Sequence, residues 1–240
     1  MYAARFTAAA FAAFLLVPGI QAGSAQAQTA SPAQDNRLRW LDPVTFAPAN
    51  AFAPPPAPGS DVERLEFERL RALIAGASAE RLKRAAWDGD HEDPAAFSEA
   101  AGRDLAQFPA TASLLAAISG EVDRAVHAAK AYFKRPRPYQ MDPSLPHCGK
   151  GSTAPTGYPS GHSGYGWSVG WTLARLIPER APAILARAQD YALSREICGV
   201  HFISDLEASR GAATAAAEQL LADPRLASQL AAARAELAAR

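Results

Sequence analysis

The sequence predicts an all-α protein, a single-domain helical bundle with one long irregular loop. Apolar residues recur at spacings of three and four in several segments, which is the period of a helix that buries one face. Runs of alternating Val, Ile and Thr, which are typical of strands, do not occur. Residues 136–159 contain several Pro and Gly and few aliphatic side chains, which indicates a loop. No repeat of about 20 to 50 residues is present, so we expect a bundle and not a solenoid.

The helical pattern begins near residue 61, where Phe67, Leu70 and Ile74 share a face, and it resumes with Leu82 beyond a break at residues 76–78. Further helices are expected over the ranges Asp93–Ala106, Ala112–Arg135, Gly161–Leu176, Pro182–Arg195, Gly199–Leu221 and Asp223–Ala239. The long loop joins two of these helices, and a loop of that length usually has a function.

The N-terminal residues have the order of a secretory signal peptide. Arg5 supplies a positive charge, residues 6–20 are apolar but too few to span a bilayer, and residues 25–27 (Ala-Gln-Ala) fit a cleavage motif. An earlier cleavage point at residues 22–24 and a buried N-terminal helix are the alternatives. We therefore assign residues 1–27 to a signal peptide and predict a periplasmic or secreted protein.

The remaining chain divides by composition at about residue 60. Residues 28–60 are rich in Pro and Ala and are predicted to form an extended arm, held on the body by Trp40 and Phe46. Residues 61–240 carry the helical patterns and form the predicted helical domain.

The charge of the chain is balanced, with 24 Lys and Arg against 24 Asp and Glu. This balance argues against nucleic acid or an anionic membrane as a constant partner. Charged residues interrupt every Ala-rich stretch after the signal, so no stable membrane insertion is expected. Ala-rich helical surfaces permit a homodimer.

The two cysteines, Cys148 and Cys198, would enter an oxidising compartment after export. A disulfide between them is one expectation, and two buried free thiols are the other. No Cys or His cluster has the spacing of metal ligands, so neither a metal site nor a cofactor is predicted.

Three separate segments carry groups suited to binding phosphate. In the first, Lys130 and Arg137 are seven residues apart, or two helical turns, so both cations could reach one anion, although Pro136 would bend the last turn. A solvated cluster that balances a helix dipole is the alternative. The neighbouring Lys134 and Arg135 are expected to be solvated charges.

The second segment is residues 157–164, Gly-Tyr-Pro-Ser-Gly-His-Ser-Gly, in front of an apolar helical stretch. A helix that opens at Ser160 and Gly161 presents backbone N–H groups and its positive dipole end to an anion, and His162 lies beside them. A capped helix start with a structural His is the alternative. Tyr158 is a candidate for lining the pocket.

The third segment contains Arg195, His201 and Asp205. His201 and Asp205 are four residues apart and are expected on one helical face, so the carboxylate could hold one imidazole nitrogen while the other points outward. Arg195 adds a third cation. A surface ion pair and a helix-surface charge are the alternatives. Three other histidines fall outside the segments and are expected at surface or supporting positions: His91, His127 and His147.

Together the segments resemble the signature K-x6-R-P, P-S-G-H, S-R-x5-H-x3-D of the type-2 phosphatidic acid phosphatase superfamily. Every fixed position is present: Lys130, Arg137, Pro138, Pro159, Ser160, Gly161, His162, Ser194, Arg195, His201 and Asp205. The surroundings of Tyr158 are similar to the hallmark G-S-Y-P-S-G-H-T of class A bacterial non-specific acid phosphatases. Here Thr156 and Gly157 stand in place of G-S, and Ser163 in place of the final Thr.

The resemblance implies an acid phosphatase that needs no metal and acts on small phosphomonoesters. His201 is expected to attack phosphorus while Asp205 orients its ring, and His162 to protonate the leaving group and then activate water. Five positions are expected to bind the phosphate oxygens: Lys130, Arg137, Ser160, Gly161 and Arg195. Because a protonated His162 is needed, an acidic to near-neutral optimum is expected.

Four other functions share parts of this pattern. Vanadium-dependent haloperoxidases carry the same signature on generally much longer chains, and a phosphotransferase would use the same scaffold. Lipid phosphatases with this signature cross membranes. An exported phosphate-binding module would capture phosphate without turnover, but binding alone does not need two histidines.

Overall fold

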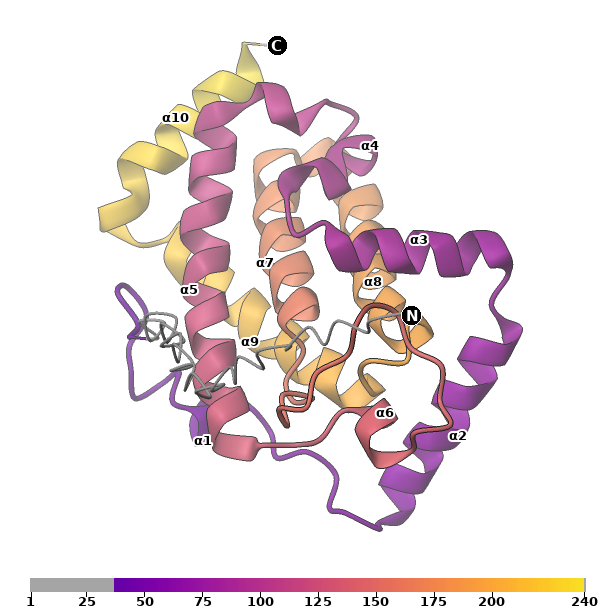
Figure 1. Cartoon of the computed structure of the whole chain (residues 1–240). Coiled ribbons are helices and arrows are strands. Elements are labelled where there is room, and N and C mark those ends of the chain that lie inside the picture. Colours follow the sequence, from indigo (N-terminus) through magenta and orange to yellow (C-terminus); the bar gives the residue numbers. More distant parts are fainter. Residues whose placement is uncertain (1–36, 240) are drawn as a thin grey trace, which may run out of the picture. The chain divides into compact units, whose positions relative to one another are not determined.

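The computed structural model describes residues 37–239, and every regular element in that range is helical (Figure 1). The all-α prediction is confirmed. Seven longer helices in this range are α2 (Asp61–Gly76), α3 (Ala79–Asp90), α5 (Pro109–Phe133), α7 (Gly161–Leu176), α8 (Ala181–Ile197), α9 (Ile203–Leu221) and α10 (Ala227–Ala238). The predicted signal peptide, residues 1–27, lies outside the described residues, as does the beginning of the arm.

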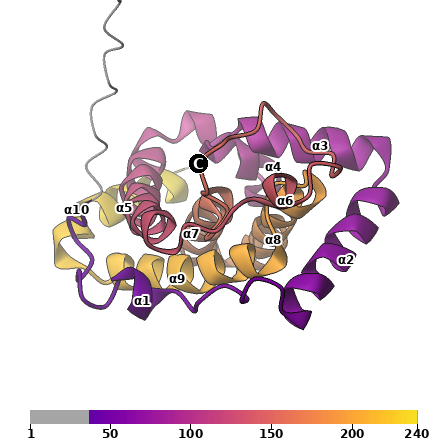
Figure 2. The same ribbon diagram turned by 60° about the horizontal axis from the view of Figure 1, so that its bottom comes forward.

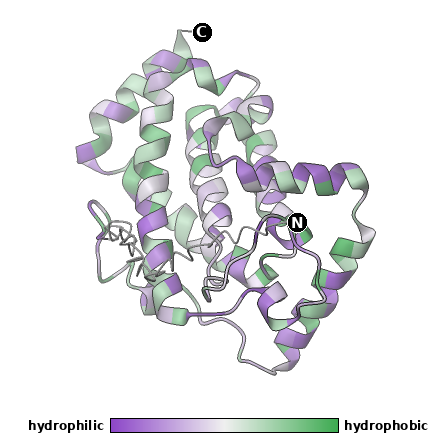
Figure 3. Cartoon of the chain, viewed as in Figure 1, coloured by the Kyte–Doolittle hydropathy of each residue, from purple (hydrophilic) through white to green (hydrophobic). Residues whose placement is uncertain are grey.

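Helix α7 lies at the centre of the described part, packed against α5, α8 and α9 (Figures 1 and 2). Its glycines allow this close packing. A Cβ atom at Gly166 would lie 2.7 Å from the Tyr191 ring of α8, and one at Gly170 would lie 2.7 Å from Ala188 Cβ. In Figure 3, hydrophilic positions are frequent on α3, which crosses α8, whereas apolar positions recur along α5. The interior position of α7 fixes the place of its N-terminus, which lies within the second predicted phosphate segment, residues 157–164.

Polar side chains define where several helices begin. Ser60 caps α2 by accepting a hydrogen bond from Glu63 N, Ser78 caps α3 in the same way from Arg81 N, and Ser160 caps α7. The predicted range Gly161–Leu176 matches α7.

The helix predicted over Asp93–Ala106 is wrong. That stretch holds η1 (Pro94–Phe97), α4 (Ser98–Ala101) and η2 (Leu105–Gln107). Gly102 has a φ of 68°, which ends the helical path, and Asp93 and Asp104 each cap a new short turn. The helix predicted over Asp223–Ala239 is likewise two elements in the structure, η4 (Pro224–Leu226) and α10.

The arm is anchored by a buried carboxylate of α5. Glu121 Oε1 accepts hydrogen bonds from the backbone N–H groups of residues 39–41 at 2.6, 2.9 and 3.2 Å. Phe46 is buried in the main core and Trp40 packs against it. The arm is not extended throughout, because α1 (Pro48–Ala51) interrupts it.

Residues 136–159 form a loop that contains the single-turn helix α6 (Pro138–Met141). A disulfide joins Cys148 in this loop to Cys198 at the end of α8, and Cys148 N donates a hydrogen bond to Cys198 O. η3 (Pro178–Arg180) connects α7 to α8. Within residues 37–239, no helix is both long enough and apolar enough to cross a membrane.

Candidate active site

His201 lies in the short connection between α8 and α9, before the helix begins at Ile203. The prediction that His201 and Asp205 share a helical face is therefore wrong. They meet because Asp205 folds back over the helix start: its Oδ2 accepts from Phe202 N at 2.7 Å and lies 3.4 Å from His201 Nδ1. The shorter contact of His201 Nδ1 is with Gly157 O, at 2.6 Å. Because a carbonyl only accepts, the proton lies on Nδ1 and the lone pair of the neutral ring lies on Nε2.

Arg135 is a site residue that the sequence analysis placed wrongly in solvent. Its side chain is 5% exposed, and Nη1 donates to Asp205 Oδ1 at 2.7 Å. Its neighbour Lys134 is exposed, as expected. The two differ because α5 ends at Phe133 and Lys134 adopts a left-handed conformation, with φ of 50°, which redirects the chain inward at Arg135.

Lys130 and Arg137 meet at the loop and not on a shared helix. Lys130 is in the last turn of α5, whereas Arg137 follows the end of that helix and directly precedes α6. Lys130 Nζ donates to Thr156 O at 2.7 Å, and Arg137 Nη1 lies 3.2 Å from His201 Nε2. A cavity of about 510 Å³ opens beside both cations, and its wall includes His127.

The start of α7 supplies the second predicted segment. Ser160 is buried, and its hydroxyl oxygen caps the helix by accepting from Ser163 N at 3.3 Å, so its own O–H remains as the donor for a phosphate oxygen. Gly161 is the first helical residue, so its backbone N–H has no acceptor in the preceding turn. A Cβ atom at Gly161 would meet no atom within 4 Å, which shows open space on that side.

His162 contacts the end of α3, which no sequence motif indicated. Its Nε2 lies 3.0 Å from Gly89 O, and its Nδ1 lies 3.3 Å from Glu92 Oε1. Both partners are acceptors when Glu92 is ionised, so together they favour the imidazolium form, which is the form that can give a proton. Tyr191 lies under the ring, with 6.1 Å between the ring centroids.

Among the buried side chains of residues 37–239, Arg195 is the cation with two nitrogens that lack a hydrogen-bond partner. It is 7% exposed, yet its Nε and Nη1 have no hydrogen-bond partner. Gly89 makes room for it, since a Cβ atom there would lie 2.4 Å from Arg195 Nη1. A buried guanidinium with unsatisfied donors is suited to bind an anion.

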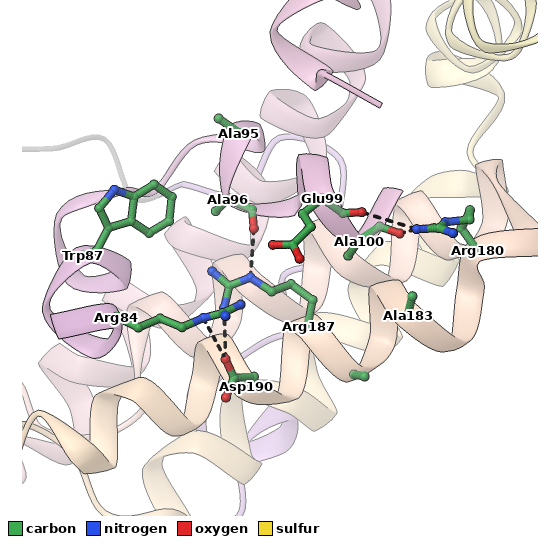
Figure 4. A pocket seen from close by; sticks show the side chains of 11 residues that line it. Arg84, Trp87, Ala95, Ala96, Glu99, Ala100, Arg180, Ala183, Arg187 and Asp190 are labelled. Carbon is green, nitrogen blue, oxygen red and sulfur yellow. Dashed lines mark hydrogen bonds and ion pairs between the residues drawn. The ribbon is translucent and has the colours of Figure 1, made fainter. Parts of the chain in front are cut away.

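A second cavity, of about 720 Å³, is lined by residues of α3, η1, α4, η3 and α8 (Figure 4). Its arginines already have acceptors: Arg187 contacts Asp88 and Ala96 O, Arg180 donates to Ala100 O, and Arg84 pairs with Asp190. The cavity therefore lacks the unsatisfied cation that distinguishes the site around His201.

Burial and positive charge shift the pKa values of the central groups. Burial, and then the Arg137 charge, lower the pKa of His201 well below its ordinary value. Burial, and then the Arg195 charge, lower the pKa of His162 to about 3. Burial lowers the pKa of Lys130 to about 7. These directions leave both His201 and His162 neutral in the phosphate-free protein, because burial and the arginines outweigh the two acceptors of His162. A bound phosphate dianion would oppose the cations and raise all three pKa values, so the imidazolium form of His162 would depend on the ligand.

The predicted site residues come from different helices and loops but meet around His201 and the start of α7. In the described residues no group of three His, Cys, Asp or Glu side chains is placed to hold a metal ion.

Comparison with protein families matches residues 109–222 to the PAP2 superfamily. The acid phosphatase of Zymomonas mobilis is 32% identical over 205 residues, which cover 81% of this chain and 75% of that protein. The chain belongs to the PAP2 acid phosphatase family.

Two further relatives are named non-specific acid phosphatases. The protein of Providencia stuartii is 33% identical over 77% of this chain and 78% of its own length. The protein of Salmonella typhimurium is 30% identical over 66% of this chain and 68% of its own. The PAP2 match contains every signature position from Lys130 to Asp205, whereas Gly89 and Glu92 precede it. The family pattern therefore accounts for the predicted site but not for the contacts that α3 adds.

Proposed function

We propose that this chain is an exported acid phosphatase that hydrolyses small phosphomonoesters through a phosphohistidine on His201, without a metal ion. The observation that carries the proposal is the orientation of the His201 ring. Nδ1 donates to Gly157 O at 2.6 Å, so the Nε2 lone pair points toward the guanidinium of Arg137 at 3.2 Å. Nε2 accepts a hydrogen bond from that guanidinium in the free protein. A phosphate that binds Arg137 in its place would free the lone pair and place phosphorus in front of it.

In the first step, His201 Nε2 forms a bond to phosphorus as the bond from phosphorus to the ester oxygen breaks. His162 transfers its proton to the departing alkoxide, which leaves as an alcohol. In the second step, neutral His162 takes a proton from water as the oxygen attacks the phosphohistidine. Inorganic phosphate leaves, and His201 regains its lone pair.

Positive charge supports both steps. Lys130, Arg137 and Arg195 lie around His201, and each lowers its pKa electrostatically. The same charges would stabilise the three equatorial oxygens of the transferring group as negative charge develops on them. This field supplies the electrostatic role that a metal ion has in other phosphatases, which supports the metal-independent route.

Export is supported by the N-terminal sequence, with its single Arg, apolar run and Ala-x-Ala motif. We expect the signal peptide, residues 1–27, to be cleaved and the remainder to act in the periplasm or outside the cell. N-terminal sequencing of protein recovered from the periplasm would test this, and a mature chain beginning near Gln28 is the expected result.

The function is tested by hydrolysis of a chromogenic phosphomonoester at acidic to neutral pH in excess EDTA. We expect turnover by the wild type, inhibition by vanadate, and a loss of at least about 10⁴-fold in His201→Ala. Quenching with alkaline denaturant during turnover should trap a phosphate on the wild type only, and acid should then release it. Turnover that requires a metal, or a trapped phosphate that persists in His201→Ala, would contradict the mechanism. Halide oxidation with vanadate and peroxide in place of hydrolysis would indicate a haloperoxidase.

A further inference from the structure

A buried chain of charges connects α2 to the proposed nucleophile. Arg135 lies between two carboxylates: Nη2 donates to Glu66 Oε2 and Nη1 to Asp205 Oδ1, both at 2.7 Å. The side chains of all three residues are at most 5% exposed. Ser204 closes the arrangement, since its N–H donates to Glu66 Oε1 and its hydroxyl accepts from Arg135 Nη1. The guanidinium also lies 4.5 Å from the centre of the Phe202 ring.

The backbone of Arg135 reaches His201 by a second route. Arg135 O accepts from Gly157 N at 2.8 Å, and Gly157 O accepts from His201 Nδ1 at 2.6 Å. Gly157 fits closely there, because a Cβ atom would lie 2.6 Å from Pro136 O. The side chain of Arg135 thus holds the Asp205 carboxylate beside His201 Nδ1. The backbone carbonyl of Arg135 holds Gly157, whose own carbonyl accepts the hydrogen bond from Nδ1.

We propose that Arg135 is the positioning residue of the nucleophile: it fixes the His201 ring through Asp205 and Gly157, and Glu66 balances its charge. This inference rests on the proposed function for its kinetic consequences. Arg135 is buried behind Asp205 and bonds protein groups on both sides, so its role is to act through other residues. Glu66 belongs to α2 and precedes residues 109–222, the part of the chain that matches the PAP2 superfamily.

The charges around Asp205 determine whether replacing Arg135 or Glu66 raises or lowers the pKa of its carboxyl. The charged and titratable groups that act on this carboxyl are Arg135, Glu66, His201, Lys130, Arg137 and Tyr158. Burial raises the pKa of Asp205 to about 7, the charge of Arg135 opposes that rise, and Glu66 adds to it. Loss of Arg135 therefore favours the protonated carboxyl, and loss of the Glu66 charge favours the carboxylate.

The test compares Arg135→Gln with Glu66→Gln in the full chain, by the pH dependence of kcat/KM and by thermal unfolding. We expect Arg135→Gln to move the acidic limb to higher pH by about one unit or more, and Glu66→Gln to move it to lower pH. In Arg135→Gln, kcat should fall about 10- to 100-fold with KM little changed, by analogy with groups that orient metal-bound histidines. Arg135→Lys should restore the acidic limb, because it keeps the charge, but not kcat, because it cannot bridge both carboxylates.

The control is Arg187→Gln, which breaks another buried ion pair, to Asp88. It should lower the melting temperature and leave the acidic limb in place. Glu66→Gln keeps the proposal testable when Arg135→Gln does not fold. Shifts in the same direction for the Arg135 and Glu66 variants, or no shift in either, would overturn the positioning role.

A second readout separates this inference from the proposed function. The ring nitrogens of His201, followed by NMR as a function of pH, report its ionisation without any turnover. Removing the positive charge of Arg135 should raise the pKa of His201, and removing the negative charge of Glu66 should lower it. If the His201 pKa shifts in opposite directions in the Arg135 and Glu66 variants while the wild type hydrolyses no phosphomonoester, the positioning role is supported and the phosphatase function is rejected. If the His201 pKa is unchanged in both variants while the wild type hydrolyses phosphomonoesters, the phosphatase function is supported and the positioning role is rejected.

Discussion

Among the arginines around the site, Arg195 has the fewest hydrogen bonds within the protein. Arg135 bonds two carboxylates, whereas Nε and Nη1 of Arg195 have no hydrogen-bond partner although the side chain is almost fully buried. Burying a cation without partners is costly, and burial lowers the pKa of Arg195 in agreement with that cost. The arrangement is explained when an anion completes the hydrogen bonds, as phosphate would in the proposed function.

We therefore expect Arg195→Gln to reduce kcat/KM for a phosphomonoester by about 10²- to 10³-fold, the effect of removing one donor from a transition-state site. The same substitution should increase the stability of the phosphate-free protein, because it removes a buried charge. Steady-state kinetics and urea unfolding measure the two effects.

Arg180→Gln is the matched control, since Arg180 lies in the cavity of Figure 4 and already donates to Ala100 O. Its kcat/KM should equal that of the wild type. Equal losses in the two variants would show that Arg195 has no special role in binding phosphate.

At this scale, the sequence pattern predicted which residues gather at the site but not all of their partners. The signature located His201 and Arg195, because their spacing is set by the chemistry of the family. The pattern gave no reason to select Gly89 or Glu66, because these groups contribute from helices outside the signature. Arg135 was misplaced because a charged residue next to Lys134 is usually solvated, and only the left-handed turn at Lys134 reverses its direction.

At the level of elements, the ends of helices control the site more than their lengths do. α9 was expected to begin at Gly199, and it begins at Ile203 because Gly199 has a φ of 67°, which no helix accepts. The hydrophobic period could not reveal this, since it extends through residues 199–202 regardless of backbone conformation. The displaced start leaves His201 in a connection, where Asp205 reaches it by capping the helix.

Gly199→Ala should be strongly destabilising. A Cβ atom at this position would lie 2.2 Å from Pro146 O, and the left-handed conformation alone costs about 1–2 kcal/mol for other residues. We expect the free energy of unfolding, measured in urea, to fall by more than that amount, and kcat to fall because His201 is two residues away.

Gly211→Ala provides the comparison within α9, where an added Cβ atom meets nothing within 4 Å. Here the substitution should stabilise the protein by about 0.5–1 kcal/mol, because Ala favours a helix interior over Gly. The same sign of change in both variants would contradict the proposed reason for the helix start.

At the scale of the whole described chain, a disulfide cross-links the long loop to the helices packed around α7. The disulfide between Cys148 and Cys198 spans 50 residues, a segment that includes the whole of α7 and α8. The sequence allowed this pairing without requiring it, because the distance between two cysteines depends on the fold. The all-α class followed from composition and period, since both are properties of whole segments.

The double variant Cys148→Ser/Cys198→Ser should have a free energy of unfolding about 4 kcal/mol lower than the oxidised wild type, from the entropy that a link of this length removes from the unfolded chain. Urea unfolding measures the difference. Reductant should destabilise the wild type to a similar extent and leave the double variant unchanged. Equal stability of the oxidised wild type and the double variant would mean that the link adds no net stability.

The Cys148–Cys198 link also has a consequence for when the protein becomes active. Thiol pools in the cytosol keep cysteines reduced, so a chain that has not yet been exported would lack the link. A less stable chain is unfolded more often and is removed sooner by proteases. Under the proposed export, full activity would begin only after the chain has crossed the membrane. The phosphate esters of cytoplasmic metabolism would then be protected from the phosphatase while it is being made.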